Sequence, residues 1–140
     1  MSAAIYYHPE AFNTTGPKLM GRNAAGESFL RGYLNYSKTK EFWVYVEDTQ
    51  HADEYLKTVK RFGRSEPVKA IYRNSLSALS QSGLIFYPGP DISKYSFNRA
   101  LLQRHGSWSL CGITHTTSSN RAMDAIIDLI SCPVYPWDAL

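Results

Sequence analysis

The chain has 140 residues, of which 44% are hydrophobic and 14% aromatic, which predicts one compact domain and excludes a disordered segment. Its 15 Lys and Arg are scattered among 12 Asp and Glu, for a formal net charge of +3, and form no basic stripe of the kind that binds nucleic acid. No apolar stretch approaches the roughly 20 residues that cross a bilayer, and residues 1–6 do not resemble a signal peptide, so we expect a cytoplasmic protein without a transmembrane segment.

The first half of the chain predicts two strand–helix units. Residues 3–7 are apolar and aromatic, as in a buried strand. The helix that follows carries apolar side chains at the spacing of one face: Ala25, Phe29, Leu30, Tyr33 and Leu34. Residues 42–46 predict a second strand, and Asp48 or Thr49 can cap a helix that stops at Gly63. The inner face of that helix is expected to consist of Ala52, Leu56, Val59 and Phe62.

Two further strands are expected at residues 68–72 and 84–87, with a short helix at 75–81 between them that ends at Gly83. The strand at 84–87 stops at Pro88-Gly89-Pro90, because proline cannot donate to a ladder. Asp91 is expected to cap the next helix, which Gly106 ends. The inner face of this helix is predicted as Phe97, Ala100, Leu101 and His105.

A strand at residues 108–113 leads into Thr114–Asn120, a segment rich in hydroxyl groups. The last predicted helix shows a third apolar face: Ala122, Ala125, Ile126, Leu129 and Ile130. Residues 134–140 resemble the approach to another strand, and we therefore expect a fragment whose second half is absent.

These cues recur at roughly 20 to 25 residue intervals and predict an α/β fold with a mainly parallel sheet of about five or six strands. We expect a Rossmann-like, doubly wound domain with helices on both faces. Right-handed crossovers place three unusual segments at the carboxyl edge of the sheet, where such folds bind ligands: Gly16–Gly26, Pro88–Pro90 and Thr114–Asn120.

The glycine-rich segment Gly16–Gly26 precedes a helix, an arrangement that suits phosphate binding. It lacks the Lys-Ser/Thr pair of a nucleotide triphosphatase and the Gly-x-Gly-x-x-Gly pattern of a dinucleotide site, which disfavours both classes. Arg22 can still pair with a diphosphate through its two-pronged guanidinium. Alternatively, these glycines only permit a turn and close helix packing.

His115 lies at the expected end of a central strand, beside Thr114 and Thr116. There it can hydrogen-bond a polyol or act in acid–base chemistry, although a structural histidine and ordinary helix-capping hydroxyls are equally open. Tyr87 and the turn after it line an acceptor groove or form a rigid surface turn. The other histidines show no zinc spacing, and Cys111 and Cys132 are expected to be buried reduced thiols, so we expect neither a metal nor a cofactor.

Three segments together resemble the N-terminal domain of bacterial group 1 retaining glycosyltransferases: residues 16–30, the turn Tyr87–Pro90, and Cys111–Thr116. Such enzymes face two Rossmann-like domains across a cleft and transfer a sugar from a nucleotide-sugar donor to an acceptor with retention at the anomeric carbon. The resemblance implies that residues 1–140 form the acceptor-side domain and that the C-terminal donor-binding domain is absent, so that the isolated chain is inactive. The acceptor is unknown.

The same resemblance implies roles for individual residues. The loop at Gly21 and Arg22 would approach the donor diphosphate, and His115 would lie near the reacting centre as the catalytic residue. Tyr87, Thr114 and Thr116 would contact the acceptor or the sugar. Many family members place two adjacent glycines in the first loop, whereas Gly16 and Gly21 are separated here by other residues.

Two other classes compete with the glycosyltransferase interpretation. One is a non-catalytic Rossmann-like module that binds a small phosphorylated ligand or nucleotide. The other is a response-regulator-like domain, which is disfavoured because residues 5–10, at the end of the first strand, contain a single carboxylate.

Overall fold

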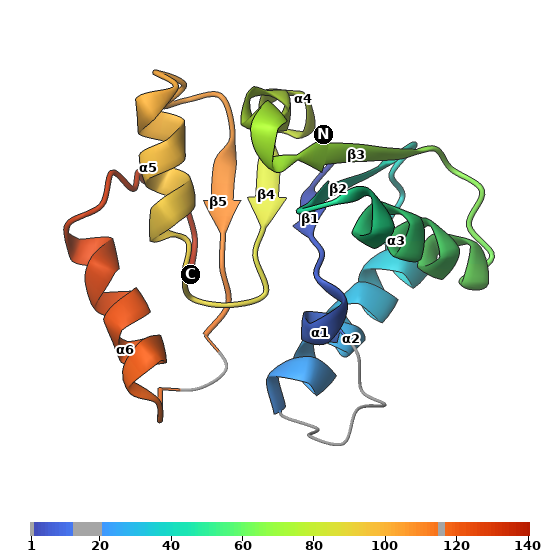
Figure 1. Ribbon diagram of the computed structural model, residues 1–140, viewed down its shortest axis with the longest axis horizontal. Helices are drawn as coiled ribbons and strands as arrows, with labels where there is room; N and C mark the ends of the chain where they lie inside the picture. Colours follow the sequence, from blue (N-terminus) through green and yellow to red (C-terminus); the bar gives the residue numbers. More distant parts are fainter. Residues whose placement is uncertain (1, 13–20, 115–116) are drawn as a thin grey trace.

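The computed structural model describes residues 2–12, 21–114 and 117–140, except for the side chain of Arg22. Five parallel strands form one sheet in the order β3-β2-β1-β4-β5 (Figure 1). The strands are β1 (Ala4–Tyr6), β2 (Phe42–Val46), β3 (Val68–Tyr72), β4 (Leu84–Phe86) and β5 (Ser109–Cys111). The predicted α/β, Rossmann-like, doubly wound fold is confirmed.

The strand order reverses between β1 and β4. The chain first adds β2 and β3 on one side of β1, then returns to place β4 on the other side, in register Ala4↔Ile85 and Ile5↔Phe86. Connections leave β1 and β4 toward opposite faces of the sheet, which opens a crevice at their carboxyl ends. This edge is the lower one in Figure 1.

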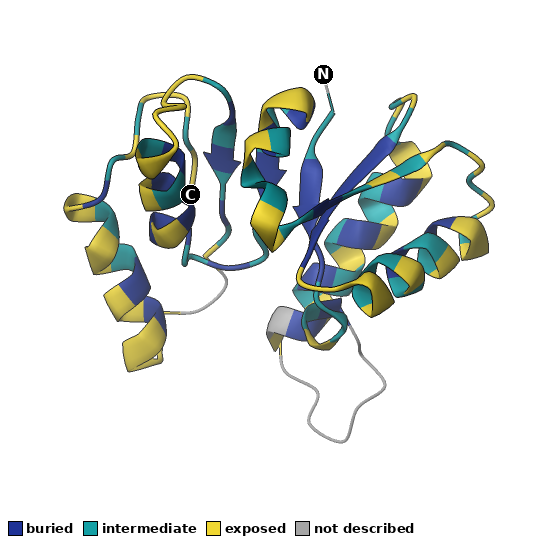
Figure 2. Ribbon diagram, turned by 45° about the horizontal axis from the view of Figure 1, so that its top comes forward, coloured by how far each residue is buried: buried dark blue, intermediate teal, exposed yellow. Residues whose placement is uncertain are grey.

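One face of the sheet is covered by α1 (Pro9–Phe12), α2 (Gly21–Tyr36) and α3 (Thr49–Arg61). Alternate strand residues such as Ile5 and Val44 pack there against Leu34 and Val59, as expected from the apolar spacing of both helices. The Asp48 carboxylate accepts from the His51 N–H at 2.9 Å and caps α3, as predicted. Figure 2 shows the strands as a mostly buried layer and the helices with exposed outer sides.

The other face is covered by the 3-10 helix η1 (Arg73–Ala78), α4 (Leu79–Ser82) and α5 (Ser93–Leu101). Its core contains Tyr45, Ile71, Leu79, Ile85 and Leu110. α6 (Asn120–Ile127) and the 3-10 helix η2 (Asp128–Ile130) lie at the β5 end of the molecule (Figure 1). After them, Ala139 forms one parallel bridge with Cys111, where we had expected the approach to a strand.

The predicted inner face of α5 is wrong. Leu101 is 82% exposed and Phe97 is 48% exposed, whereas Tyr95, Ser96 and Arg99 are buried. The reason is a long-range ion pair: Asp138, near the C-terminus, accepts two hydrogen bonds from Arg99 and so draws the polar side of the helix inward. His105 is exposed and lies beyond the helix.

Two details of the helix ends also differ from expectation. α5 ends at Leu101, before Gly106, and its N-cap is Ile92 rather than Asp91. Asp91 instead accepts a hydrogen bond from the Ser93 hydroxyl at 3.5 Å. In α6, Ala122 and Ala125 are buried as predicted, but Ile130 is 87% exposed because the chain changes to the 3-10 helix η2 before that residue.

Candidate functional site

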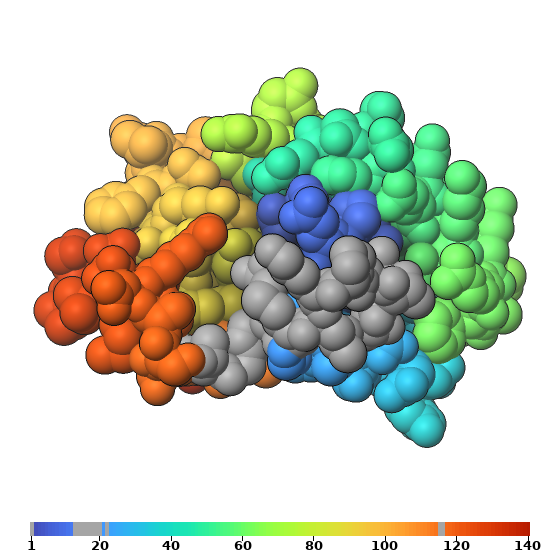
Figure 3. Space-filling view, turned by 60° about the horizontal axis from the view of Figure 1, so that its bottom comes forward, coloured from blue at the N-terminus to red at the C-terminus, as the bar shows by residue number. Residues whose placement is uncertain are grey.

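A pocket of about 330 Å³ opens at the carboxyl edge where the strand order reverses. We call it the switch pocket. It is lined by the end of β1 and the residues after it, by the turn that follows β4, and by one side of α6 with its N-cap. These residues are Tyr6, His8, Glu10, Ala11, residues 87–91, Ser119, Arg121, Ala122 and Ala125. Figure 3 shows this edge, with α6 on one side of the hollow and the segment after β1 on the other. A doubly wound fold binds ligands at this position.

Two tyrosine rings form an aromatic wall of the switch pocket. The ring centroids of Tyr6 and Tyr87 are 4.9 Å apart, and both rings pack near Tyr95 in the core. The Lys94 ammonium lies 5.7 Å from the Tyr87 centroid and adds a cation–π contact. The packing fixes the aromatic wall in place, so a ligand can bind without first ordering it.

The turn after β4 is held by backbone contacts. The Tyr87 N–H donates to the Cys111 carbonyl at 2.8 Å, and the Gly89 N–H donates to the Tyr87 carbonyl at 2.8 Å. A Cβ at Gly112 would lie 2.8 Å from the Gly89 carbonyl oxygen, so glycine is required for the turn to rest against the chain after β5. The turn is therefore a rigid wall of the switch pocket.

Charged and titratable groups gather around the same pocket. Glu10 and Arg121 are exposed, and His8 and Asp91 are half-buried. Within the described part of the chain, neither Glu10 nor Arg121 forms an ion pair. His8 Nδ1 accepts from the Glu10 N–H at 3.3 Å, which leaves Nε2 as the protonated nitrogen of the neutral ring.

A second hollow, the outer hollow, lies at the carboxyl ends of β2 and β3. It is lined by Glu47, Asp48, Thr49, Tyr72, Arg73 and Asn74. The Tyr6 hydroxyl donates to Glu47 Oε1 at 3.1 Å and links the outer hollow to the switch pocket. Burial, and then the Glu47 charge, raise the pKa of Tyr6 well above its usual value, so the hydroxyl stays protonated and remains a donor.

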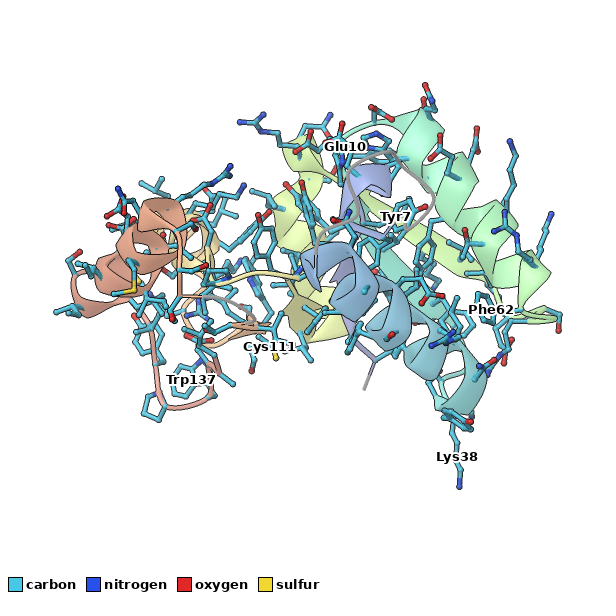
Figure 4. All side chains as sticks on the ribbon, turned by 90° about the horizontal axis from the view of Figure 1, so that it is seen from below. Tyr7, Glu10, Lys38, Phe62, Cys111 and Trp137 are labelled. Carbon is cyan, nitrogen blue, oxygen red and sulfur yellow. The ribbon has the colours of Figure 1, made fainter. Side chains whose placement is uncertain are left out.

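Figure 4 views the molecule from below. Glu10 and Tyr7 lie centrally, between Trp137 on one side and Phe62 on the other. Glu10 lines the switch pocket, whereas Trp137 is half-exposed and does not line it.

Of the residues predicted as a site, Tyr87 lines the switch pocket, and Thr114 is exposed beyond the end of β5. His115 and Thr116 lie outside the described residues. Gly21 and Arg22 occupy the first turn of α2 rather than a loop, and Gly21 does not line the switch pocket.

Close helix packing, the alternative role for the glycines of Gly16–Gly26, explains one of them. A Cβ at Gly26 would lie 2.5 Å from the Ala11 carbonyl oxygen, so Gly26 permits α1 and α2 to pack closely. Asn23, which is buried, donates to the Glu10 carbonyl and strengthens the same contact. Among the described residues, none lies within 4 Å of a Cβ at Gly21, so their packing gives no reason for glycine there.

Sequence reasoning missed His8, Glu10 and Arg121 as pocket residues, and it treated Asp91 only as a helix cap. His8 and Glu10 follow the first strand, a position that places side chains at the ligand edge of any such sheet. The sequence therefore held a sufficient cue for these two residues. Arg121 required knowledge of where α6 lies.

Comparison of the chain with protein-family models, with curated proteins and with solved structures finds no match. In the described ranges, no helix is both long and apolar enough to cross a membrane. Nor do those ranges contain a cluster of three or more His, Cys, Asp or Glu side chains suited to a metal ion. The fold and the switch pocket define the chain as a Rossmann-like α/β domain with a pocket at its topological switch point.

Proposed function

We propose that this chain is the N-terminal, acceptor-side domain of a retaining glycosyltransferase of the bacterial group 1 type, and that the acceptor binds in the switch pocket. One observation carries the proposal. The turn Tyr87–Pro90, which is one of the segments that resemble the family, forms a rigid wall of the pocket at the reversal of strand order. The nucleotide-sugar donor and a second, C-terminal domain belong to the same proposal.

The chemistry of the switch pocket suits a sugar. The apolar C–H faces of a sugar ring stack on aromatic rings, which Tyr6 and Tyr87 supply. Its hydroxyl groups donate to carboxylates such as Glu10 and Asp91 and accept from Arg121. A pocket that combines an apolar wall with a few polar groups both binds and orients its ligand.

In this proposal the domain positions the acceptor and excludes water, while the second domain holds most of the nucleotide. Gly21 and Arg22, at the start of α2, face the donor diphosphate, where a helix N-terminus favours negative charge. His115 lies near the donor sugar. Sugar transfer of this kind requires no cofactor from the domain.

A second candidate is a non-catalytic module that binds a small phosphorylated ligand or nucleotide. Ser119 and Arg121, at the start of α6, favour it because both line the switch pocket. Glu10 and Asp91 in the same pocket oppose it, because carboxylates repel phosphate. We therefore rank this module second.

The test uses protein expressed from the complete reading frame that contains these residues. Nucleoside diphosphate release is measured with UDP-glucose, UDP-N-acetylglucosamine and GDP-mannose, in the presence of simple glycosides as acceptors. We expect release from one donor, and about a tenfold lower kcat/KM in Tyr87→Ala, since loss of one stacking contact costs about 1–1.5 kcal/mol. His115→Ala is expected to lower transfer as well.

The matched control is Tyr36→Ala, at the end of α2, where Tyr36 is 83% exposed. It should leave release unchanged, and Tyr87→Phe, which keeps the ring, should retain most of the activity. Thermal melts establish that each variant is folded. No release from any donor, together with phosphate binding that Arg121→Ala abolishes, would support the non-catalytic module instead.

A further inference from the structure

The outer hollow and the switch pocket share one edge of the sheet. The switch pocket opens between the ends of β1 and β4, and the outer hollow opens between the ends of β2 and β3. Neighbouring strands are about 4.8 Å apart, so the centres of the two hollows are about two strand spacings, or roughly 10 Å, from each other. A disaccharide or trisaccharide spans such a separation.

The two hollows also share a composition. Each has at least one tyrosine ring, two carboxylates and one arginine: Tyr6, Tyr87, Glu10, Asp91 and Arg121 in the switch pocket, and Tyr72, Glu47, Asp48 and Arg73 in the outer hollow. Asp48 caps α3, which leaves Glu47 as the carboxylate available to a ligand in the outer hollow. Among the described residues, Arg73 forms no ion pair, so its guanidinium is available as well.

The balance of charge in the two hollows disfavours an anionic ligand. Four carboxylates face two guanidiniums across the two hollows, a balance that repels phosphate groups. The same planar groups are good partners for pairs of neighbouring hydroxyls, to which both carboxylates and guanidiniums can make two hydrogen bonds. Polyhydroxylated, uncharged sugar units meet both conditions.

A direct contact joins the two hollows. The Tyr6 ring lines the switch pocket, and its hydroxyl donates to Glu47 Oε1 at 3.1 Å in the outer hollow. The hydrogen bond holds the Glu47 carboxylate beside the aromatic wall. A ligand that leaves the switch pocket toward β2 therefore meets Glu47 next.

Building on the proposed function, we propose that the acceptor is a neutral oligosaccharide of at least two sugar units. The first unit occupies the switch pocket, and the next occupies the outer hollow against Tyr72, Glu47 and Arg73. The outer hollow thus selects for the length of the acceptor.

The experiment is ¹⁵N–¹H NMR titration of the 140-residue chain with maltotriose, cellotriose and chitotriose, with the corresponding monosaccharides, and with pyrophosphate. We expect one trisaccharide to shift the amides of Gly89 and Asn74 together, and its monosaccharide to shift Gly89 alone. The trisaccharide should bind about tenfold more tightly than the monosaccharide, which corresponds to one additional favourable contact region. Arg73→Ala should remove that gain, whereas Arg104→Ala, which changes an exposed arginine outside both hollows, should retain it.

The outcomes separate this inference from the proposed function. A trisaccharide that shifts only Gly89, with the affinity of its monosaccharide, overturns the outer subsite and leaves the switch pocket as the acceptor site. Shifts caused by pyrophosphate alone overturn the neutral oligosaccharide and support the phosphate-binding module. If no sugar shifts either amide, the inference is overturned, and the glycosyltransferase proposal is decided by nucleoside diphosphate release.

Discussion

Arg99 and Asp138 form a buried, two-point ion pair between α5 and the C-terminal segment, with Nη1–Oδ1 at 2.8 Å and Nη2–Oδ2 at 2.6 Å. Their side chains are 0% and 3% exposed. Asp138 also accepts the backbone N–H groups of Leu110 and Tyr135, and Arg99 donates to the Trp108 carbonyl. The pair thus fastens the last residues of the chain to β5 and to the face of the sheet that α5 covers.

Replacing one partner of this pair should destabilise the domain strongly. In Arg99→Met, the Asp138 carboxylate stays buried without its cation, so we expect a loss of about 3–5 kcal/mol in the free energy of unfolding. Urea denaturation followed by circular dichroism measures it, with Arg104→Met at an exposed arginine as the control. A loss below about 1 kcal/mol, as is usual for a surface pair, would show that the ion pair is not buried in solution.

The same pair should make stability fall in acid. Burial raises the pKa of Asp138, but hydrogen bonds from Arg99 and from the Leu110 and Tyr135 N–H groups outweigh it and lower the pKa below the ordinary 3.8. Because the folded-state pKa lies below the unfolded one, this stabilisation is complete above about pH 5 and is lost as the pH falls through the folded-state pKa. Unfolding free energies between pH 6 and pH 2 should therefore fall less steeply in Asp138→Asn than in the wild type, and equal slopes would contradict the assignment.

Replacing two glycines of α2 by alanine should change the stability of the domain in opposite directions. A Cβ at Gly26 would lie 2.5 Å from the Ala11 carbonyl oxygen, so Gly26→Ala forces α1 and α2 apart and should cost about 1–3 kcal/mol. A Cβ at Gly32 would meet none of the described residues within 4 Å, so Gly32→Ala should stabilise the helix by about 0.5–1 kcal/mol. Melting temperatures of the two variants give the comparison, and equal shifts would argue against the close contact at Gly26.

The substitution Gly21→Ala distinguishes a role of Gly21 in ligand binding from a role in folding. No described residue lies within 4 Å of a Cβ at this position, so Gly21→Ala should leave the melting temperature unchanged or raise it. If the donor diphosphate approaches the start of α2, the added methyl group should raise the KM for the nucleotide-sugar about tenfold in protein from the complete reading frame. Unchanged kinetics in a stable variant would remove Gly21 from the donor site.

The sheet could be predicted from the sequence, whereas the orientation of α5 could not. β2 and β3 both have the bounds expected from their sequences. β2 is buried on both faces and shows this as a run of consecutive apolar residues. β3 is an edge strand in which only Ile71 is fully buried. The buried face of α5 depends on Asp138, which lies 39 residues beyond Arg99. An arginine whose partner is that distant looks like an ordinary solvent-exposed residue in the local pattern.

Only part of the candidate site could be predicted, because some of its residues stand out in the local sequence and others depend on the order of the strands. The segment Pro88–Pro90 consists of proline and glycine, which are typical of turns, so the rigid wall beside Tyr87 could be predicted from local sequence alone. Glu10 and Arg121 line the same pocket only because β1 lies beside β4, and that pairing is a property of the strand order. The roles of His115 and Arg22 stay predictions.

The most direct test of the glycosyltransferase proposal compares two proteins in one assay: the 140-residue chain and the product of the complete reading frame that contains it. Nucleoside diphosphate release is measured from the same panel of nucleotide-sugars at equal protein concentration. The proposal predicts release by the complete product and none by the 140-residue chain, because the acceptor-side domain lacks most of the nucleotide site. Equal release by both proteins, or a complete product that releases nothing from any donor, would contradict it.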